Sequence, residues 1–179
     1  MSPPLYNPAS IGSLTLLDTQ TAANTTTTTL TFSGIVGTYK SLVVAGVLRT
    51  DRAGTPDTIN VACNADTTAA NYSYRLASFS QATATTAGYQ EAATSGRVCC
   101  YVPGSTSAAS MPAAVRIEIP QYAGTSFHKS ITGTGTAADN VSVHSCVWKN
   151  TAPITSLAFS PGLGTNFAQN STVALYGVS

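Results

Sequence analysis

Short runs in which apolar and polar side chains alternate recur along this chain, and no other feature constrains its fold as strongly. The clearest run spans residues 113–120, where aliphatic residues alternate with Arg116 and Glu118. A period of two points one set of side chains into a core and the other toward solvent, as in a β-strand. No segment carries an apolar stripe at helical spacing. The chain is therefore predicted to be all-β.

Turn sequences separate these runs at the spacing expected of a β-sandwich or barrel. The runs predict about ten or eleven short strands, arranged as an antiparallel β-sandwich of jelly-roll type. Residues 58–63 and 72–80 are predicted to form a hairpin, and the Gly-Thr sequence after Ile131 is predicted to be a turn. Residues 80–96 have the weakest apolar signal and are predicted to be a long loop.

The segment from residue 154 to residue 179 contains two further apolar runs around the turn sequence SPGLG. Leu157 and Phe159 share one face of the first run, and Val173 and Leu175 repeat this pattern in the second. We expect the two runs to form paired strands, so that the chain ends inside its own core.

The length of 179 residues suits one domain with a substantial core. We predict a single β-sandwich domain over residues 14–179, preceded by an extended N-terminal arm over residues 1–13. Pro3 and Pro4 stiffen this arm, and Leu5 and Tyr6 are candidate anchors on a partner. The four residues are therefore the candidate partner-binding residues, and a disordered leader is the alternative.

Charge is scarce in this chain. Charged residues make up 8% of the sequence, against about 25% in ordinary soluble domains. A net charge of +1 provides no excess of positive charge to bind nucleic acid. It also leaves little electrostatic repulsion between densely packed copies of the protein. The start lacks a secretory signal, and no apolar run is long enough to cross a membrane. We therefore expect synthesis in the cytoplasm and no nucleic-acid or membrane partner.

The four cysteines, Cys63, Cys99, Cys100 and Cys146, lack metal-ligand spacing. Cys99 and Cys100 are adjacent, so in a strand they point to opposite faces and do not suit a disulfide with each other. We predict reduced thiols that act as small buried apolar side chains, with a structural disulfide as the alternative.

Few groups are available for acid-base chemistry. His128, His144 and seven acidic residues make up the whole set, and no motif brings them together. The nucleophile elbow, the zinc-protease motif and the phosphate-binding loop are absent. The sequence GTGTAA from Gly133 lacks the strand-turn-helix context of a dinucleotide site. We predict that the protein is not an enzyme and holds no cofactor.

Two weak metal-binding patterns occur. His144 and Cys146 share one face of a strand, but a zinc site needs three or four ligands. Asp51, Asp57 and Asp66 lie in two turns that flank one predicted hairpin, where calcium is conceivable. Aspartates in turns most often bond to their own backbone, and so no metal is predicted.

Several aromatic residues allow a sugar-binding interpretation. Tyr72, Tyr74, Tyr89 and Trp148 provide candidate stacking faces, and Asn, Ser and Thr side chains provide uncharged hydrogen-bonding groups. The alternative is that the same aromatic residues pack in the core or at subunit contacts.

Three segments, residues 39–75, 117–130 and 154–179, together resemble a recurrent structural protein of tailed bacteriophages. In that family a strand ends in an Arg-rich turn, a turn resembling Asn-Gly-Asp precedes a Tyr-rich strand, and a Pro-Gly loop leads to a terminal Leu-Tyr-Gly. This chain has Asn-Ala-Asp at residues 64–66 and Leu-Tyr-Gly at residues 175–177.

The resemblance implies a non-enzymatic capsid decoration, or cement, protein. Such a protein docks on the outer surface of a phage head as a homo-oligomer, expected to be a trimer, and bridges subunits of the major capsid protein. Its place would be the capsid exterior of the virion, after synthesis in the cytoplasm of the host bacterium. The alternative is a tail or fibre module that binds a host surface glycan.

Overall fold

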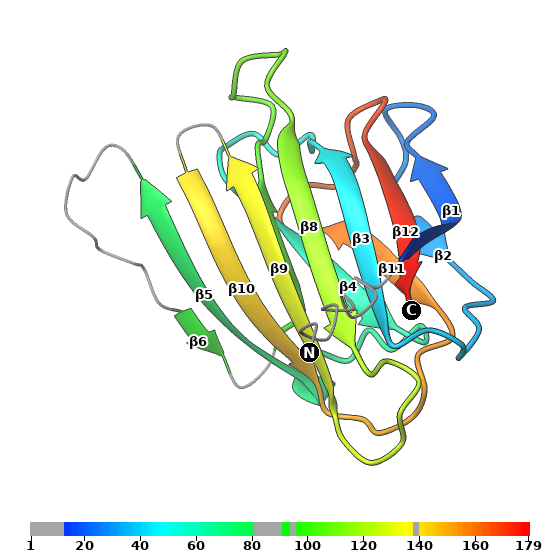
Figure 1. The fold of residues 1–179 in the computed structure, drawn as a ribbon. Coiled ribbons are helices and arrows are strands. Elements are labelled where there is room, and N and C mark those ends of the chain that lie inside the picture. The colour runs from blue at the N-terminus through cyan, green and yellow to red at the C-terminus, as the bar shows by residue number, and fades with distance from the viewer. Residues whose placement is uncertain (1–12, 81–90, 94–95, 138–139) are drawn as a thin grey trace, which may run out of the picture.

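The computed structural model describes residues 13–80, 91–93, 96–137 and 140–179. Within these residues the chain is almost entirely β-structure, arranged as two antiparallel sheets packed face to face (Figure 1). This confirms the predicted all-β sandwich architecture. The candidate anchors Pro3, Pro4, Leu5 and Tyr6 lie outside the described residues.

The larger sheet has eight strands in the order β1-β12-β3-β8-β9-β10-β5-β6. Figure 1 shows these strands side by side, with β1 and β6 at the two edges. Their bounds are β1 Leu14–Thr21, β12 Thr172–Val178, β3 Ser41–Leu48, β8 Ala113–Pro120, β9 Lys129–Ala137, β10 Asn140–Trp148, β5 Tyr72–Ser80 and β6 Glu91–Ala93.

The smaller sheet has four strands in the order β2-β11-β4-β7. Their bounds are β2 Leu30–Phe32, β11 Leu157–Pro161, β4 Asp57–Cys63 and β7 Val98–Val102. A single 3-10 turn, Ala69–Asn71, precedes β5. The twelve strands of the described residues exceed the predicted ten or eleven, and β6 falls within the segment predicted to be a loop.

The core fills the space between the two sheets. In β8 the residues alternate between buried and exposed along the whole strand, as the sequence predicted. The predicted pattern also holds at the C-terminus, where Val173 and Leu175 are 1% exposed and belong to the core. Since β12 is flanked by β1 and β3, the last strand is paired on both sides within the larger sheet.

The expected hairpin between residues 58–63 and 72–80 is wrong. β4 lies in the smaller sheet, whereas β5 lies in the larger sheet beside β10. The connection passes through Asn64 and Ala65, both at positive φ, and through the 3-10 turn. This geometry carries the chain from one sheet to the other instead of reversing it within one sheet.

The expected pairing of the two C-terminal strands is also wrong. β11 pairs with β2 and β4, whereas β12 pairs with β1 and β3. The connection between them begins at Gly162, directly after Pro161 ends β11, and it crosses between the sheets. The apolar residues were correctly assigned to the core, but a period-two pattern does not reveal which strands are partners.

The Gly-Thr sequence after Ile131 continues β9 to Ala137 and does not form the predicted turn. Gly133 and Gly135 face the interior, where the backbone of β7 passes directly over them. A methyl group at Gly133 would overlap the carbonyl oxygen of Cys99, and one at Gly135 would overlap that of Tyr101. These glycines therefore permit close approach between the sheets.

Candidate interaction surface

The outer face of the larger sheet is the broadest surface that the described strands present. Registered side chains form rows that cross the strands, since neighbouring strands pair residue by residue. One row crosses six strands and consists of Ala174, Ala45, Arg116, Thr134, Val143 and Ala77. The next row consists of Tyr176, Val43, Glu118, Thr132, Ser145 and Arg75, of which Val43 is buried.

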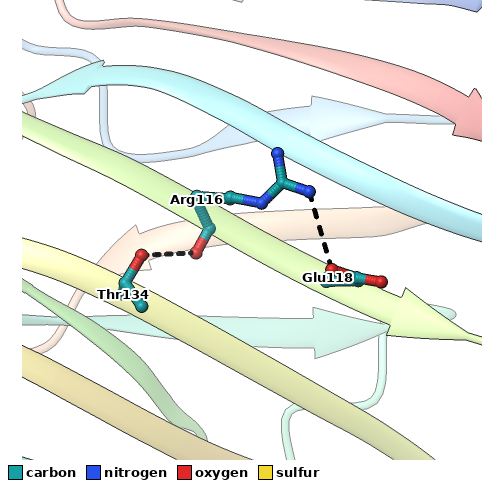
Figure 2. Close-up of polar contacts among 3 residues, drawn as sticks. All are labelled: Arg116, Glu118 and Thr134. Carbon is teal, nitrogen blue, oxygen red and sulfur yellow. Dashed lines mark hydrogen bonds and ion pairs between the residues drawn. The ribbon is translucent and has the colours of Figure 1, made fainter. Parts of the chain in front are cut away.

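Charge on this face is confined to a few positions. Across β12, β3, β8, β9 and β10, the outward side chains include two charged ones, Arg116 and Glu118, both predicted to point outward. Figure 2 shows the two together on β8, with Arg116 Nη2 3.6 Å from Glu118 Oε2. Thr134 on β9 donates a 3.5 Å hydrogen bond to the Arg116 carbonyl oxygen. The two charges partly neutralise each other, and the exposed pair contributes little to stability.

Hydroxyl and apolar side chains cover most of the remaining face. Ser130, Thr132 and Thr134 on β9 are exposed at every second position. Val141 and Val143 on β10 are 51% and 45% exposed. A shallow depression of about 310 Å³ lies beside Val143 and is also lined by Arg75 and Ala77. The face is thus mildly apolar, weakly charged and only gently hollowed.

The area of this face matches that of a protein interface. Seven adjacent long strands at about 4.8 Å spacing, each about 26 Å long, cover roughly 900 Å². A specific interface buries about 800 Å² on each partner. The face is therefore large enough to serve as one complete docking surface.

Asp51 and Asp57, considered above as calcium ligands, hold the loop between β11 and β12. Asp57 is fully buried, and its carboxylate accepts hydrogen bonds from the backbone amides of Leu163 and Gly164 at 3.0 and 3.1 Å. Asp51 accepts from the amides of Thr165 and Asn166 at 2.8 and 3.0 Å. Both carboxylates accept hydrogen bonds from a loop that is distant in sequence. The prediction that these aspartates bond mainly to their own local backbone is therefore only partly correct.

The pKa of Asp51 is lowered by these contacts. Burial by itself raises the pKa of the carboxyl, but the hydrogen bonds from the backbone and side chain of Asn166 and the amide of Thr165 outweigh it. A carboxylate that accepts several N–H groups is stabilised in its charged form. The side chain therefore serves as an anionic cap for the loop.

Asp66 organises the aromatic residues that were candidates for sugar stacking. Its carboxylate accepts hydrogen bonds from Trp148 Nε1 at 2.8 Å and from Asn71 Nδ2 at 2.9 Å. Tyr72 is 0% exposed and Trp148 is 2% exposed, and their rings stack at 6.5 Å in the core. Neither is available to a ligand. Tyr89 lies outside the described residues.

His144 is buried between the sheets. Its ring meets Tyr101 of β7 edge-on at a centroid distance of 4.9 Å. Neither ring nitrogen has a hydrogen-bond partner within the described part of the chain. Burial lowers the pKa of the imidazole to about 4. His144 is therefore neutral at pH 7 and belongs to the core.

The four cysteines are all buried and free, in agreement with the prediction of reduced thiols. Burial raises the pKa of Cys63 and of Cys146 to about 12. Neutral thiols are poor nucleophiles and poor metal ligands. Among the described residues, no group of three or more His, Cys, Asp or Glu side chains is arranged to hold a metal ion.

The outer face was not identified as a functional surface from the sequence. A signal for it was present, because residues 130–136 place hydroxyl side chains at every second position. The Gly-Thr content of the segment had suggested a turn instead. The neighbouring residues in each row come from strands far apart in the sequence, so only the register reveals the surface.

Comparison of the chain with family models, curated proteins and solved structures finds no match. In the described residues there is also no helix with the length and apolar character needed to cross a membrane. The function of this protein must therefore be inferred from its own sequence and structure.

Proposed function

We propose that this protein is a non-enzymatic structural subunit of a bacteriophage virion, of the capsid decoration type. The outer face of the larger sheet would dock on the exterior of the head and bridge subunits of the major capsid protein. The observation that carries this proposal is a broad face of roughly interface size, by strand spacing and length, whose central strand β8 carries the paired Arg116 and Glu118.

We further infer that the sandwich is an elaborated jelly roll. Eight strands form two interleaved sets, β1-β12-β3-β8 in one sheet and β2-β11-β4-β7 in the other. The connections β1 to β2, β3 to β4, β7 to β8 and β11 to β12 each cross between the sheets. This order is the one expected of a jelly roll, an architecture common in viral shells. The remaining strands, β5, β6, β9 and β10, extend the first set.

The chemistry of the face supports attachment to another protein. Burying charged groups is costly unless they are paired, and the two charged outward side chains of β12, β3, β8, β9 and β10, Arg116 and Glu118, form such a pair. Alternating hydroxyl and aliphatic side chains tolerate burial against a similar surface. A rigid sheet also loses little conformational entropy when it docks.

Reconstruction of the intact particle tests the location of the protein. We expect density for this fold on the outside of the head, at positions that contact more than one capsid subunit. The resemblance implies a trimer, which the same reconstruction would reveal. Finding the protein at the tail tip, with none on the shell, would contradict the proposal and favour the tail or fibre alternative.

A pair of matched variants tests the docking face. Val143→Lys places a charge in the central row of the face, and Leu163→Lys places the same charge on a 63%-exposed residue in the loop between β11 and β12. In a binding assay with shells that lack this protein, we expect Val143→Lys to weaken binding at least about tenfold, because an unpaired charge would be desolvated. Leu163→Lys should bind as the unmodified protein does. Equal binding by both variants would show that another face docks.

A further inference from the structure

The loop that joins β8 to β9, residues 121–128, presents an aromatic side chain to solvent. Phe127 is 74% exposed, the highest value among the large apolar side chains of the described residues. An exposed phenyl ring gains nothing from burial in the core. Folding therefore does not explain its presence.

Phe127 lines a hollow of about 400 Å³ together with polar, uncharged side chains. These include Gln121, Ser126, His128 and Ser130, all of them exposed. An amide, two hydroxyls and an imidazole can each donate or accept a hydrogen bond. The hollow thus combines one apolar ring with several uncharged polar groups.

A buried lysine holds the backbone of the loop by hydrogen bonds to its carbonyl oxygens. Lys129 is 1% exposed, and its ammonium donates hydrogen bonds to the carbonyl oxygens of Gly124 at 2.6 Å, Phe127 at 3.1 Å and Thr151 at 2.9 Å. The neighbouring Tyr122 is buried, and its hydroxyl donates to the carbonyl oxygen of Val36. The backbone of Phe127 is therefore positioned before any ligand binds, which lowers the entropic cost of binding.

We propose that this hollow binds an uncharged sugar, with Phe127 as the stacking platform. The C–H groups of a pyranose ring carry partial positive charge and pack on the negative face of an aromatic ring. The hydroxyls of the sugar would exchange hydrogen bonds with Gln121, Ser126 and His128. An open site of this size suits a weak ligand, with a dissociation constant of about 1 mM for a single sugar.

The lining of the hollow favours a sugar over a protein partner. A protein-binding anchor is usually an aromatic or Arg side chain that enters a pocket on the partner. Here Phe127 instead borders a concave site on this chain, and none of its lining residues is Lys, Arg, Asp or Glu. This chemistry also disfavours a phosphate or a carboxylate ligand, which a Lys or Arg side chain would recognise. The sugar site does not depend on docking to a shell.

Titration of the free protein, followed by two-dimensional NMR, tests the site. The probes are the methyl glycosides of glucose, galactose, mannose and N-acetylglucosamine. We expect at least one probe to shift signals of residues 120–130 selectively. Phe127→Ala should weaken binding of that probe at least tenfold, whereas Phe127→Trp should retain it because the larger ring preserves the platform.

Phe79→Ala is the matched control, because it removes a 49%-exposed phenylalanine from β5, on the outer sheet face. It should leave sugar binding unchanged. The proposal is overturned if no probe binds at 50 mM, on the order of fifty times the expected dissociation constant. It is also overturned if Phe127→Ala binds as tightly as the unmodified protein, or if the shifted signals lie on another face.

Discussion

At the scale of single residues, the interior holds two basic side chains, one with hydrogen-bond partners for its polar atoms and one without. Lys129 is buried and donates to three carbonyl oxygens, so its ammonium replaces lost water with protein hydrogen bonds. His144 is equally buried, yet both of its ring nitrogens lack partners within the described residues. Burial lowers the pKa of the Lys129 ammonium, but its three hydrogen bonds compensate for the lost water, whereas the histidine is tolerated only in its neutral form.

Stability should consequently depend on the protonation of His144. Its pKa is about 4 in the folded protein, against 6.5 as the reference value. The unfolded chain therefore binds the proton more readily, and the free energy of unfolding should fall as pH decreases from about 6.5 to about 4. The loss contributed by this residue is about 3 kcal/mol. Chemical denaturation at several pH values measures it.

His144→Phe provides the comparison for that measurement, because it removes the titrating group from the core. Its stability should vary less between pH 6.5 and pH 4 than that of the unmodified protein. If His144→Phe shows the same slope as the unmodified protein, another group is responsible for the acid sensitivity.

At the scale of elements, the contact between β7 and β9 determines how closely the sheets approach. The backbone of β7 lies over Gly133 and Gly135. Ser142 of β10 forms hydrogen bonds with both β7 and β9. Ser142 Oγ accepts a hydrogen bond from the Tyr101 amide at 3.3 Å and donates one to the Gly135 carbonyl oxygen at 3.2 Å. The edge of the smaller sheet is thereby packed against the larger sheet and is not left open.

Gly133→Ala should destabilise the protein, because the added methyl group would overlap the Cys99 carbonyl oxygen. Backbone cannot move aside as a side chain can, so we expect a loss of about 2 to 3 kcal/mol in the free energy of unfolding. Gly54→Ala is the control, since its nearest neighbour is the flexible side chain of Arg52 at 3.4 Å. Thermal and urea denaturation of both variants should separate them, and equal stabilities would refute the close contact.

At the scale of the whole molecule, the last strand joins parts of the chain that are far apart in sequence. β12 pairs with β1 near one end of the chain and with β3 on its other side. Without β12, the edge strand β1 would lose its partner in the larger sheet. Val173 and Leu175 would also be lost from the core.

A chain truncated after Asn170 should therefore fail to yield soluble, folded protein. Both neighbouring strands would expose unpaired backbone groups, which favours aggregation. Expression yield in the soluble fraction and circular dichroism provide the measurement. A chain ending at Val178 retains all of β12 and should fold normally. Soluble folded protein from the shorter truncation would contradict the central role of β12.

The sequence by itself determined which side chains enter the core, because burial follows from the alternation of apolar and polar residues along each strand. The run at residues 113–120 was predicted correctly for this reason. The buried, free cysteines were predicted instead from the absence of metal-ligand spacing. These properties depend on neighbours along the chain.

Only the tertiary structure decided which strands are partners, because apolar runs look alike wherever they pair. It separated β4 from β5 and β11 from β12, placing the members of each pair in different sheets. It also buried Tyr72 and Trp148, left Phe127 exposed, and assembled the outer face from distant strands. Each outcome depends on contacts between residues far apart in the sequence, about which a local pattern carries no information.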